Sequence, residues 1–180
     1  MPPIEYSRDS GMKALDLAHV ILNRINLFIG DEFNTRKIEQ QLPEIDRTLQ
    51  IIGNSLELSD VIPEFKNLQL YGVMLEDIIG ELSAWRSSLF KYDLELADIN
   101  KELESFSHDS AILRLARDSL YRELYMEELL ELRHKWQAAR QSTDIRLTQI
   151  KSWQLLVSKQ YFMAVDLRSR TADAAVWQRT

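Results

Sequence analysis

The sequence predicts an all-α protein: an elongated antiparallel coiled-coil hairpin joined to a small helical bundle. Only five Gly and four Pro occur in 180 residues, and neither type occurs after Gly80, so about a hundred residues run without a helix breaker. Apolar residues make up 45% of the chain and charged residues 28%, which gives long helices a buried side and a solvated side. A seven-residue apolar repeat along residues 68–106 is typical of a coiled coil.

The first expected helix covers about residues 8–29 and has a wide apolar arc. A central stripe and the residues that widen it are Leu15, Ala18, Leu22, Ile25 and Ile29, then Leu17, Val20, Ile21 and Phe28. One neighbouring helix covers only a narrow stripe, so an arc of this width predicts a bundle helix that meets two neighbours.

The second expected helix covers about residues 36–57 and contains Pro43. Proline lacks an N–H and clashes with the preceding helical turn, so we expect a kink or a short break at Gln41 and Leu42. The apolar residues continue at helical spacing on both sides of this point: Leu42, Ile45, Leu49 and Ile52. The stretch "SLELSDVIP", residues 55–63, is expected to be a connector.

The third expected helix, residues 63–106, carries the strongest pattern in the chain. With Leu68 at heptad position a, six a positions and six d positions are all apolar or aromatic: Leu68, Leu75, Leu82, Leu89, Leu96 and Leu103, then Tyr71, Ile78, Trp85, Tyr92, Ile99 and Phe106. A repeat held this long predicts a supercoiled partner helix, and the bulky d residues favour an antiparallel one. We expect the first two heptads to meet a third helix and the later ones mainly one partner.

A short turn at residues 106–111 is expected to lead into the fourth helix, with Ser107, Asp109 or Ser110 as its cap. The apolar register of this helix slips near 124–129 and again near 141–144, which predicts stutters or local breaks. The chain is expected to form a single domain of residues 1–180, in which residues 63–144 make the hairpin arm. The bundle part would combine residues 8–62 with 145–180, which extend past Pro63.

Composition and charge exclude several classes of function. The chain has no Cys, and its most apolar window, residues 14–30, contains too many polar residues to span a bilayer. Residues 145–180 hold six basic residues and two aspartates, so they carry +4 while the whole chain carries −6. These charges are spread along the helix without an aromatic platform, so a solvated helix face is favoured over binding to lipid or nucleic acid.

Two pairs, Asp16 with His19 and Glu131 with His134, resemble the carboxylate and histidine spacing of di-iron bundles. Such sites need two further inward carboxylates, and these pairs lie on polar stripes, so solvated faces are expected and no metal. No serine lies in a nucleophile elbow, and the chain has no glycine-rich phosphate loop. The sequence therefore predicts a protein that is not an enzyme and holds no cofactor.

The candidate interface residues are Phe90, Leu94, Ala97 and Trp177. The first three occupy heptad positions b and f, on the side of the helix turned away from the a/d seam, and Trp177 lies near the chain end. One interpretation is burial under a third helix, or under the side-chain stems of Arg86 and Lys101. The other is contact with a second subunit or a partner protein.

Four stretches resemble the helical N-terminal region that precedes the transmembrane helices of large bacterial mechanosensitive channels of the small-conductance type. They are "LPEIDRTLQII" (42–52), "LEDIIGELSAWRSSLFKYDLELADINKEL" (75–103), "DSLYRELYMEELLELRHKW" (118–136) and "KQYFMAVDL" (159–167). The resemblance extends over most of the chain from about residue 40 onward.

The resemblance implies an extramembrane domain on the periplasmic side of the bacterial inner membrane, with a cytoplasmic location as the alternative. Its role would be assembly, spacing or modulation of gating in the response to osmotic shock, and no catalytic residue is implied. The partners would be further copies of the chain or the rest of the channel. A non-enzymatic coiled-coil scaffold or adaptor explains the same patterns without a membrane context.

The interface hypothesis predicts the behaviour of a double variant, Phe90→Asp with Leu94→Lys. If this stripe joins subunits, the charges should dissociate an oligomer and leave the helix content unchanged, because neither position belongs to the a/d seam. Size-exclusion chromatography and circular dichroism measure both quantities. Loss of helicity would instead show that the stripe is covered within the fold.

Overall fold

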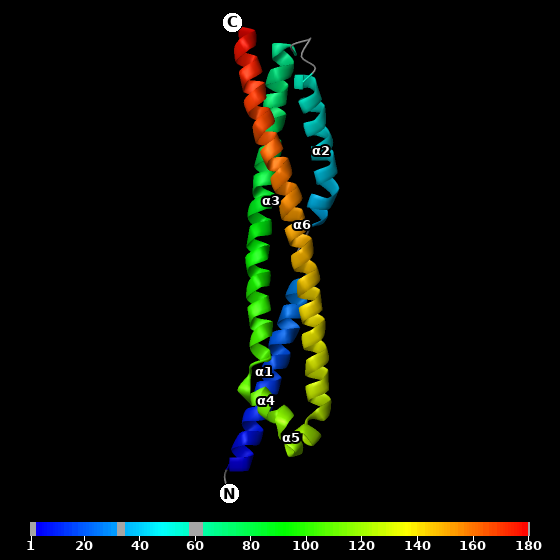
Figure 1. Ribbon diagram of the computed structural model, residues 1–180, viewed down its shortest axis with the longest axis vertical. Coiled ribbons are helices and arrows are strands. Elements are labelled where there is room, and N and C mark those ends of the chain that lie inside the picture. Colours follow the sequence, from blue (N-terminus) through cyan, green and yellow to red (C-terminus); the bar gives the residue numbers. More distant parts are fainter. Residues whose placement is uncertain (1–2, 32–34, 58–62, 180) are drawn as a thin grey trace. The chain divides into compact units, whose positions relative to one another are not determined.

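The computed structural model describes residues 3–31, 35–57 and 63–179, and these ranges contain six α-helices and no strand (Figure 1). The helices are α1 (Pro3–Asp31), α2 (Arg36–Glu57), α3 (Phe65–Phe106), α4 (Ser110–Arg117), α5 (Ser119–Leu124) and α6 (Met126–Arg179). The all-α prediction is confirmed. Of the connector expected at 55–63, residues 55–57 instead belong to α2, and residues 58–62 lie outside the described residues.

The chain divides into two compact units, each of which takes part of α3 and part of α6. Unit 1 combines residues up to 33 with 93–149, and unit 2 combines 34–92 with residues from 150 onward. This division differs from the expected one, in which residues 8–62 and 145–180 formed the bundle and 63–144 a separate arm. A repeating seam offers similar apolar surface along its whole length, so its pattern does not indicate where each further helix packs.

In unit 2, α3 and α6 run antiparallel and are joined at three levels. Gln154 Nε2 donates to the Leu89 carbonyl at 3.4 Å, Arg168 pairs with Glu76 at 3.3 Å, and Gln178 Nε2 donates to the carbonyl of Pro63. Residues 150–179 therefore lie beside the first part of α3, and the prediction that they extend past Pro63 is wrong.

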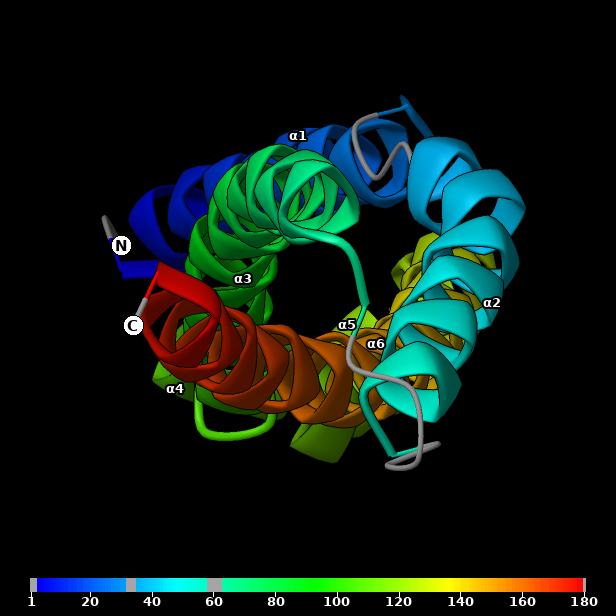
Figure 2. The same ribbon diagram turned by 90° about the horizontal axis from the view of Figure 1, so that it is seen from above.

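Helix α2 packs on both partners within unit 2 (Figure 2). The hydroxyls of Ser55 and Tyr71 are 3.0 Å apart, which joins α2 to α3. The ion pair of Arg170 with Glu57, at 3.8 Å, joins α2 to α6. The predicted stripe of α2 is buried together with Ile38, and the helix runs through Pro43 without a break. The short break is absent because the apolar stripe on both sides of Pro43 is anchored in one core. The alternative, a kink in a continuous helix, stays a prediction.

In unit 1, α1 packs against the end of α3, the start of α6, and α4. Arg24 pairs with Glu102 of α3 at 2.7 Å, and Lys135 of α6 approaches His19 Nδ1 to 3.4 Å. Gly11 lies so close to α4 that an added Cβ would be 2.9 Å from a methyl carbon of Leu115. The later heptads of α3 thus also meet a third helix, and the expectation of a single partner there is wrong.

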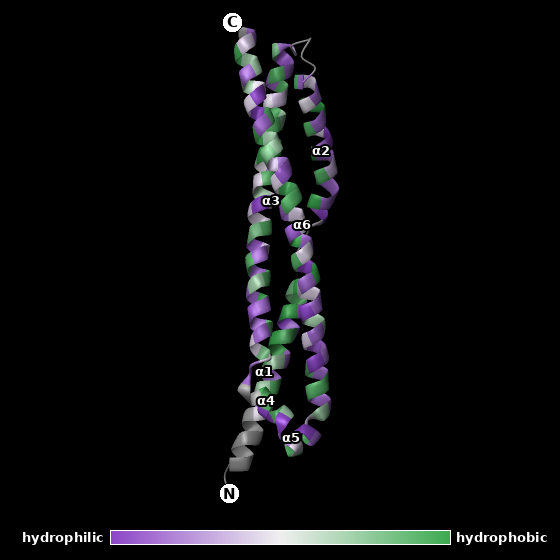
Figure 3. Ribbon diagram, viewed as in Figure 1, coloured by the Kyte–Doolittle hydropathy of each residue, from purple (hydrophilic) through white to green (hydrophobic). Residues whose placement is uncertain are grey.

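The heptad a positions of α3 are among the most deeply buried residues of both units, as the seam predicts. All six leucines have at most 1% of their surface exposed: Leu68, Leu75, Leu82, Leu89, Leu96 and Leu103. Hydrophobic and hydrophilic residues alternate along α3 and α6 accordingly (Figure 3). Each buried leucine contributes about 1.5–3 kcal/mol to folding through removal of its side chain from water.

The connection between α3 and α6 is longer than the predicted turn, because it contains α4 and α5. The Asp109 carboxylate accepts from the Ile112 N–H at 3.3 Å, which confirms Asp109 as a cap; the side chain of Ser110 is outside the described part. Asp118 then caps α5 by accepting from the Leu120 N–H at 3.1 Å. Helix α6 begins only at Met126, so its pairing with α3 is shifted from the one that a short turn at 106–111 would give.

Helix α6 is continuous through residues 141–144, where a register slip was expected. Thr143 occupies a seam position seven residues after Trp136 and is fully buried, so a polar residue in a regular heptad caused the apparent slip. Its hydroxyl donates to the Ala139 carbonyl at 2.7 Å, and buried Thr171 does the same with Leu167. The irregularity near 124–129 is real, since Tyr125 separates α5 from α6.

One buried polar contact fixes α2 on α6 in unit 2. Gln160 is 8% exposed, and its Nε2 donates to Asp46 Oδ1 at 2.6 Å. The Oε1 atom of Gln160 is buried without a hydrogen-bond partner among the described groups. Asp46 also accepts from Gln50 at 3.2 Å and is only partly buried.

This asymmetry predicts opposite results for two substitutions. Asp46→Ala leaves both polar atoms of Gln160 buried and unpaired, so it should lower the free energy of unfolding by about 1–3 kcal/mol. Gln160→Leu removes both atoms and leaves Asp46 accessible to water, so it should be neutral or stabilising. Urea unfolding followed by circular dichroism compares them; an equal loss in both variants would contradict this explanation.

Candidate functional site

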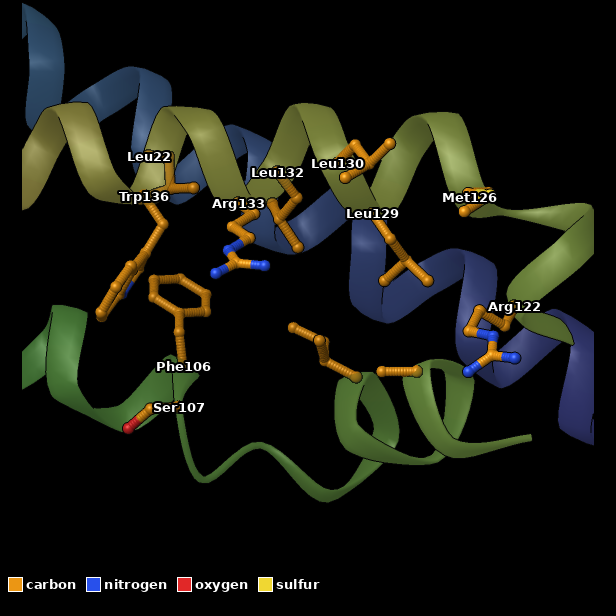
Figure 4. A pocket seen from close by; sticks show the side chains of 12 residues that line it. Leu22, Phe106, Ser107, Arg122, Met126, Leu129, Leu130, Leu132, Arg133 and Trp136 are labelled. Carbon is orange, nitrogen blue, oxygen red and sulfur yellow. The ribbon is translucent and has the colours of Figure 1, made fainter. Parts of the chain in front are cut away.

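The main concave site in the described part of unit 1 is an apolar cavity of about 390 Å3 (Figure 4). It exists because α4 and α5 leave the line of α3 after Phe106, so that α6 faces a short crossing helix instead of a continuous partner. Its walls come from five helices and include Leu22 of α1, Phe106 of α3, Ile112 of α4, Arg122 of α5, and Leu129, Leu132 and Trp136 of α6.

Part of the wall is rigid because it belongs to the unit 1 core. Leu22 has no exposed surface and Leu132 is 6% exposed. The Trp136 indole N–H donates to the Leu103 carbonyl at 2.7 Å, which holds the ring against the end of α3, and the Arg140 guanidinium lies 5.3 Å from the ring centre. The other part is open to solvent, since Met126 is 54% exposed and Leu130 48%.

The charges that line this cavity are all positive. Arg122 and Arg133 are its charged lining residues, and no Asp or Glu lines it. Neither guanidinium forms an ion pair or a hydrogen bond with any residue in the described ranges. In Figure 4, the Arg133 side chain points from α6 into the space that Phe106 also faces. The cavity therefore combines an apolar interior with two arginines that have no ion-pair partner among the described residues.

A second feature of unit 1 is an exposed apolar face on α1. Leu17, Val20 and Leu27 are 60%, 63% and 70% exposed. At 100° per residue they lie on the side of α1 opposite the buried stripe of Leu15, Ala18, Leu22, Ile25 and Ile29. Helix α1 does meet α3 and α6, but through the buried stripe, so the expectation that neighbours cover the whole arc is wrong for Leu17 and Val20.

The structure does not bring the predicted interface residues together in one unit. Phe90 and Trp177 belong to unit 2 and are 61% and 78% exposed. Leu94 and Ala97 belong to unit 1, where Leu94 is 53% exposed and Ala97 is partly buried. No described helix covers Phe90 or Leu94. Their role as an interface stays a prediction.

The Arg86 stem, one of the expected covers of Phe90, is used elsewhere in unit 2. Its guanidinium lies 4.4 Å from the ring centre of Tyr161 and 5.2 Å from that of Phe162. Phe162 is itself 61% exposed. Arg86 thus packs on aromatic rings of α6, and such cation–π contacts favour arginine over lysine.

The two histidine motifs of the sequence meet a lysine in unit 1. Lys135 pairs with Glu131 at 3.5 Å and approaches the Nδ1 atom of His19 to 3.4 Å, so an ammonium group lies beside both motifs. Among the described residues, no group of three or more His, Asp or Glu is arranged to hold a metal ion. A search of the same residues finds no helix with the length and apolarity that crossing a membrane requires.

Two basic residues within 145–180 pair with acids in unit 2, which offsets part of the excess positive charge of this segment. Arg168 pairs with Glu76 of α3, and Arg170 pairs with Glu57 of α2 and with Asp166. These pairs are largely solvent-exposed, so each adds little to stability. They direct the basic side chains toward acidic groups of the same unit.

The fold and its surfaces define a class: an all-α protein with an apolar cavity in one unit and exposed apolar helix faces. Comparisons with protein-family models, with curated proteins and with solved structures give no match. Sequence reasoning missed the cavity residues Arg122, Met126 and Arg133. The register slip at 124–129 marked the break beside them, but nothing in the pattern indicated how far α4 would depart from α6.

Proposed function

We propose that this chain is a non-enzymatic helical scaffold that assembles with a second copy through the exposed face of α1. The observation that carries the proposal is the spacing of Leu17, Val20 and Leu27. With Arg24 they follow the three-and-four spacing of a coiled-coil seam, on a helix whose other side is already buried.

The face is suited to pairing with itself. If two α1 helices met antiparallel about a twofold axis near residue 22, Leu17 of one copy would face Leu27 of the other, and Val20 would face position 24. Arg24 is already paired with Glu102 at 2.7 Å, so its charge is partly neutralised and its stem remains available to pack. Burial of three exposed side chains in each copy provides the driving force.

The test is the mass of the protein in solution. Sedimentation equilibrium should show the wild type as a dimer at roughly 100 µM, as expected for a small apolar interface. The triple variant Leu17→Ser, Val20→Ser and Leu27→Ser should be a monomer with unchanged helix content. The control is Leu70→Ser with Val73→Ser, which alters residues of similar exposure in unit 2 (56% and 61%).

Three results would contradict the proposal: a monomeric wild type, a triple variant that still dimerises, or an equal effect of the control. The double variant at Phe90 and Leu94 serves as a comparison, because it tests the other exposed face. If only the Phe90 and Leu94 variant dissociates the dimer, the interface lies on the outer side of α3 and not on α1.

A narrower proposal rests on the resemblance of residues 42–52, 75–103, 118–136 and 159–167 to channel sequences. In it, the scaffold is the periplasmic extramembrane domain of a mechanosensitive channel of the small-conductance type, and it serves assembly, spacing or gating. The residues that follow Thr180 in the natural gene test this directly. Several long hydrophobic spans would support it, and a continuation without any would contradict it.

A further inference from the structure

We infer that the cavity of unit 1 binds a small amphipathic anion, with a single aliphatic chain in the apolar interior and a carboxylate at the two arginines. A medium-chain fatty acid is the simplest molecule of this class. This site is distinct from the exposed face of α1 and goes beyond the proposed scaffold role.

The size and lining of the cavity favour a small ligand. A volume of about 390 Å3 lies within the usual range of ligand pockets, roughly 300–1,000 Å3. Buried groups form one wall, and Met126 and Leu130, flexible and about half exposed, form the rim. A partly rigid apolar wall with an adaptable rim suits an aliphatic chain, while the limited volume favours one chain over a two-chain phospholipid.

The electrostatics select the sign of the head group. Arg122 and Arg133 add two positive charges to the lining, and no carboxylate lines it. Of the acids that are near in the sequence, Glu131 pairs with Lys135, and Asp118 accepts from the Leu120 N–H. Guanidinium groups bind carboxylates through two parallel hydrogen bonds, so these two arginines favour an anion over an alcohol or an amine.

Trp136 gives a direct readout, because it lines the cavity and is the tryptophan of unit 1, whereas Trp85, Trp153 and Trp177 lie in unit 2. A brominated ten-carbon fatty acid, added below its micelle concentration, should quench tryptophan fluorescence in a saturable manner. Trp136→Phe should remove this quenching, and the matched control Trp153→Phe should retain it.

The arginines are tested by competition and substitution. Unbrominated decanoate should displace the probe about tenfold more effectively than decanol, and decyltrimethylammonium should be weaker still. Arg122→Gln with Arg133→Gln should abolish the preference for decanoate, while Arg47→Gln, an exposed site in unit 2, should leave it unchanged. Calorimetric titration of the wild type and the double arginine variant with decanoate measures the loss of decanoate affinity without using Trp136 fluorescence.

Several results would overturn the inference. These are quenching that does not saturate, equal displacement by decanol and decanoate, equal loss of quenching in the two tryptophan variants, or a carboxylate preference that survives loss of both arginines. Circular dichroism establishes that each variant keeps its helix content, which is expected because Arg122 and Arg133 are exposed.

Discussion

The leucines at the a positions of α3 are the constraint on which each unit depends. Their seven-residue spacing keeps one side of α3 against α6, and their near-complete burial makes each of them costly to replace by a smaller residue. Once this seam is formed, α1 and α2 each pack into the groove beside it, one in each unit. The buried threonines of α6 keep the seam regular because their hydroxyls bond to their own helix. The hydrogen bond between Gln160 of α6 and Asp46 fixes the position of α2 along α6.

The connection through α4 and α5 links the fold to the candidate site. It delays the start of α6 to Met126, and this delay determines which residues of α6 pair with α3 in each unit. It also leaves an apolar space that a tight hairpin turn would have closed. Arg122 and Arg133 line this space, so the same local departure from regular pairing produces both the cavity and its charge. The site is thus a consequence of chain length between two seam helices.

The sequence was sufficient for local structure and insufficient for long-range packing. Heptad spacing predicted α3 and its buried leucines, because these follow from periodicity, and the bulky d residues with the short turn at 106–111 predicted the antiparallel pairing. It misplaced α1, because the apolar stripe of α1 fits any part of a repeating seam. It also read Thr143 as a slip, since a polar residue in a seam position cannot be distinguished by pattern from a shifted register. The cavity depended on the path of α4, which short-range patterns do not specify.

The antiparallel seam is tested most directly by chemical crosslinking within unit 2, and the absence of native cysteine makes the experiment clean. Glu76→Cys with Arg168→Cys replaces an ion pair of 3.3 Å between α3 and α6. A short bismaleimide should crosslink this pair within one molecule. Glu76→Cys with Lys151→Cys should not be crosslinked, because Lys151 lies roughly 25 Å further along α6. Equal crosslinking of both pairs, or crosslinking of the second alone, would contradict the register on which the account rests.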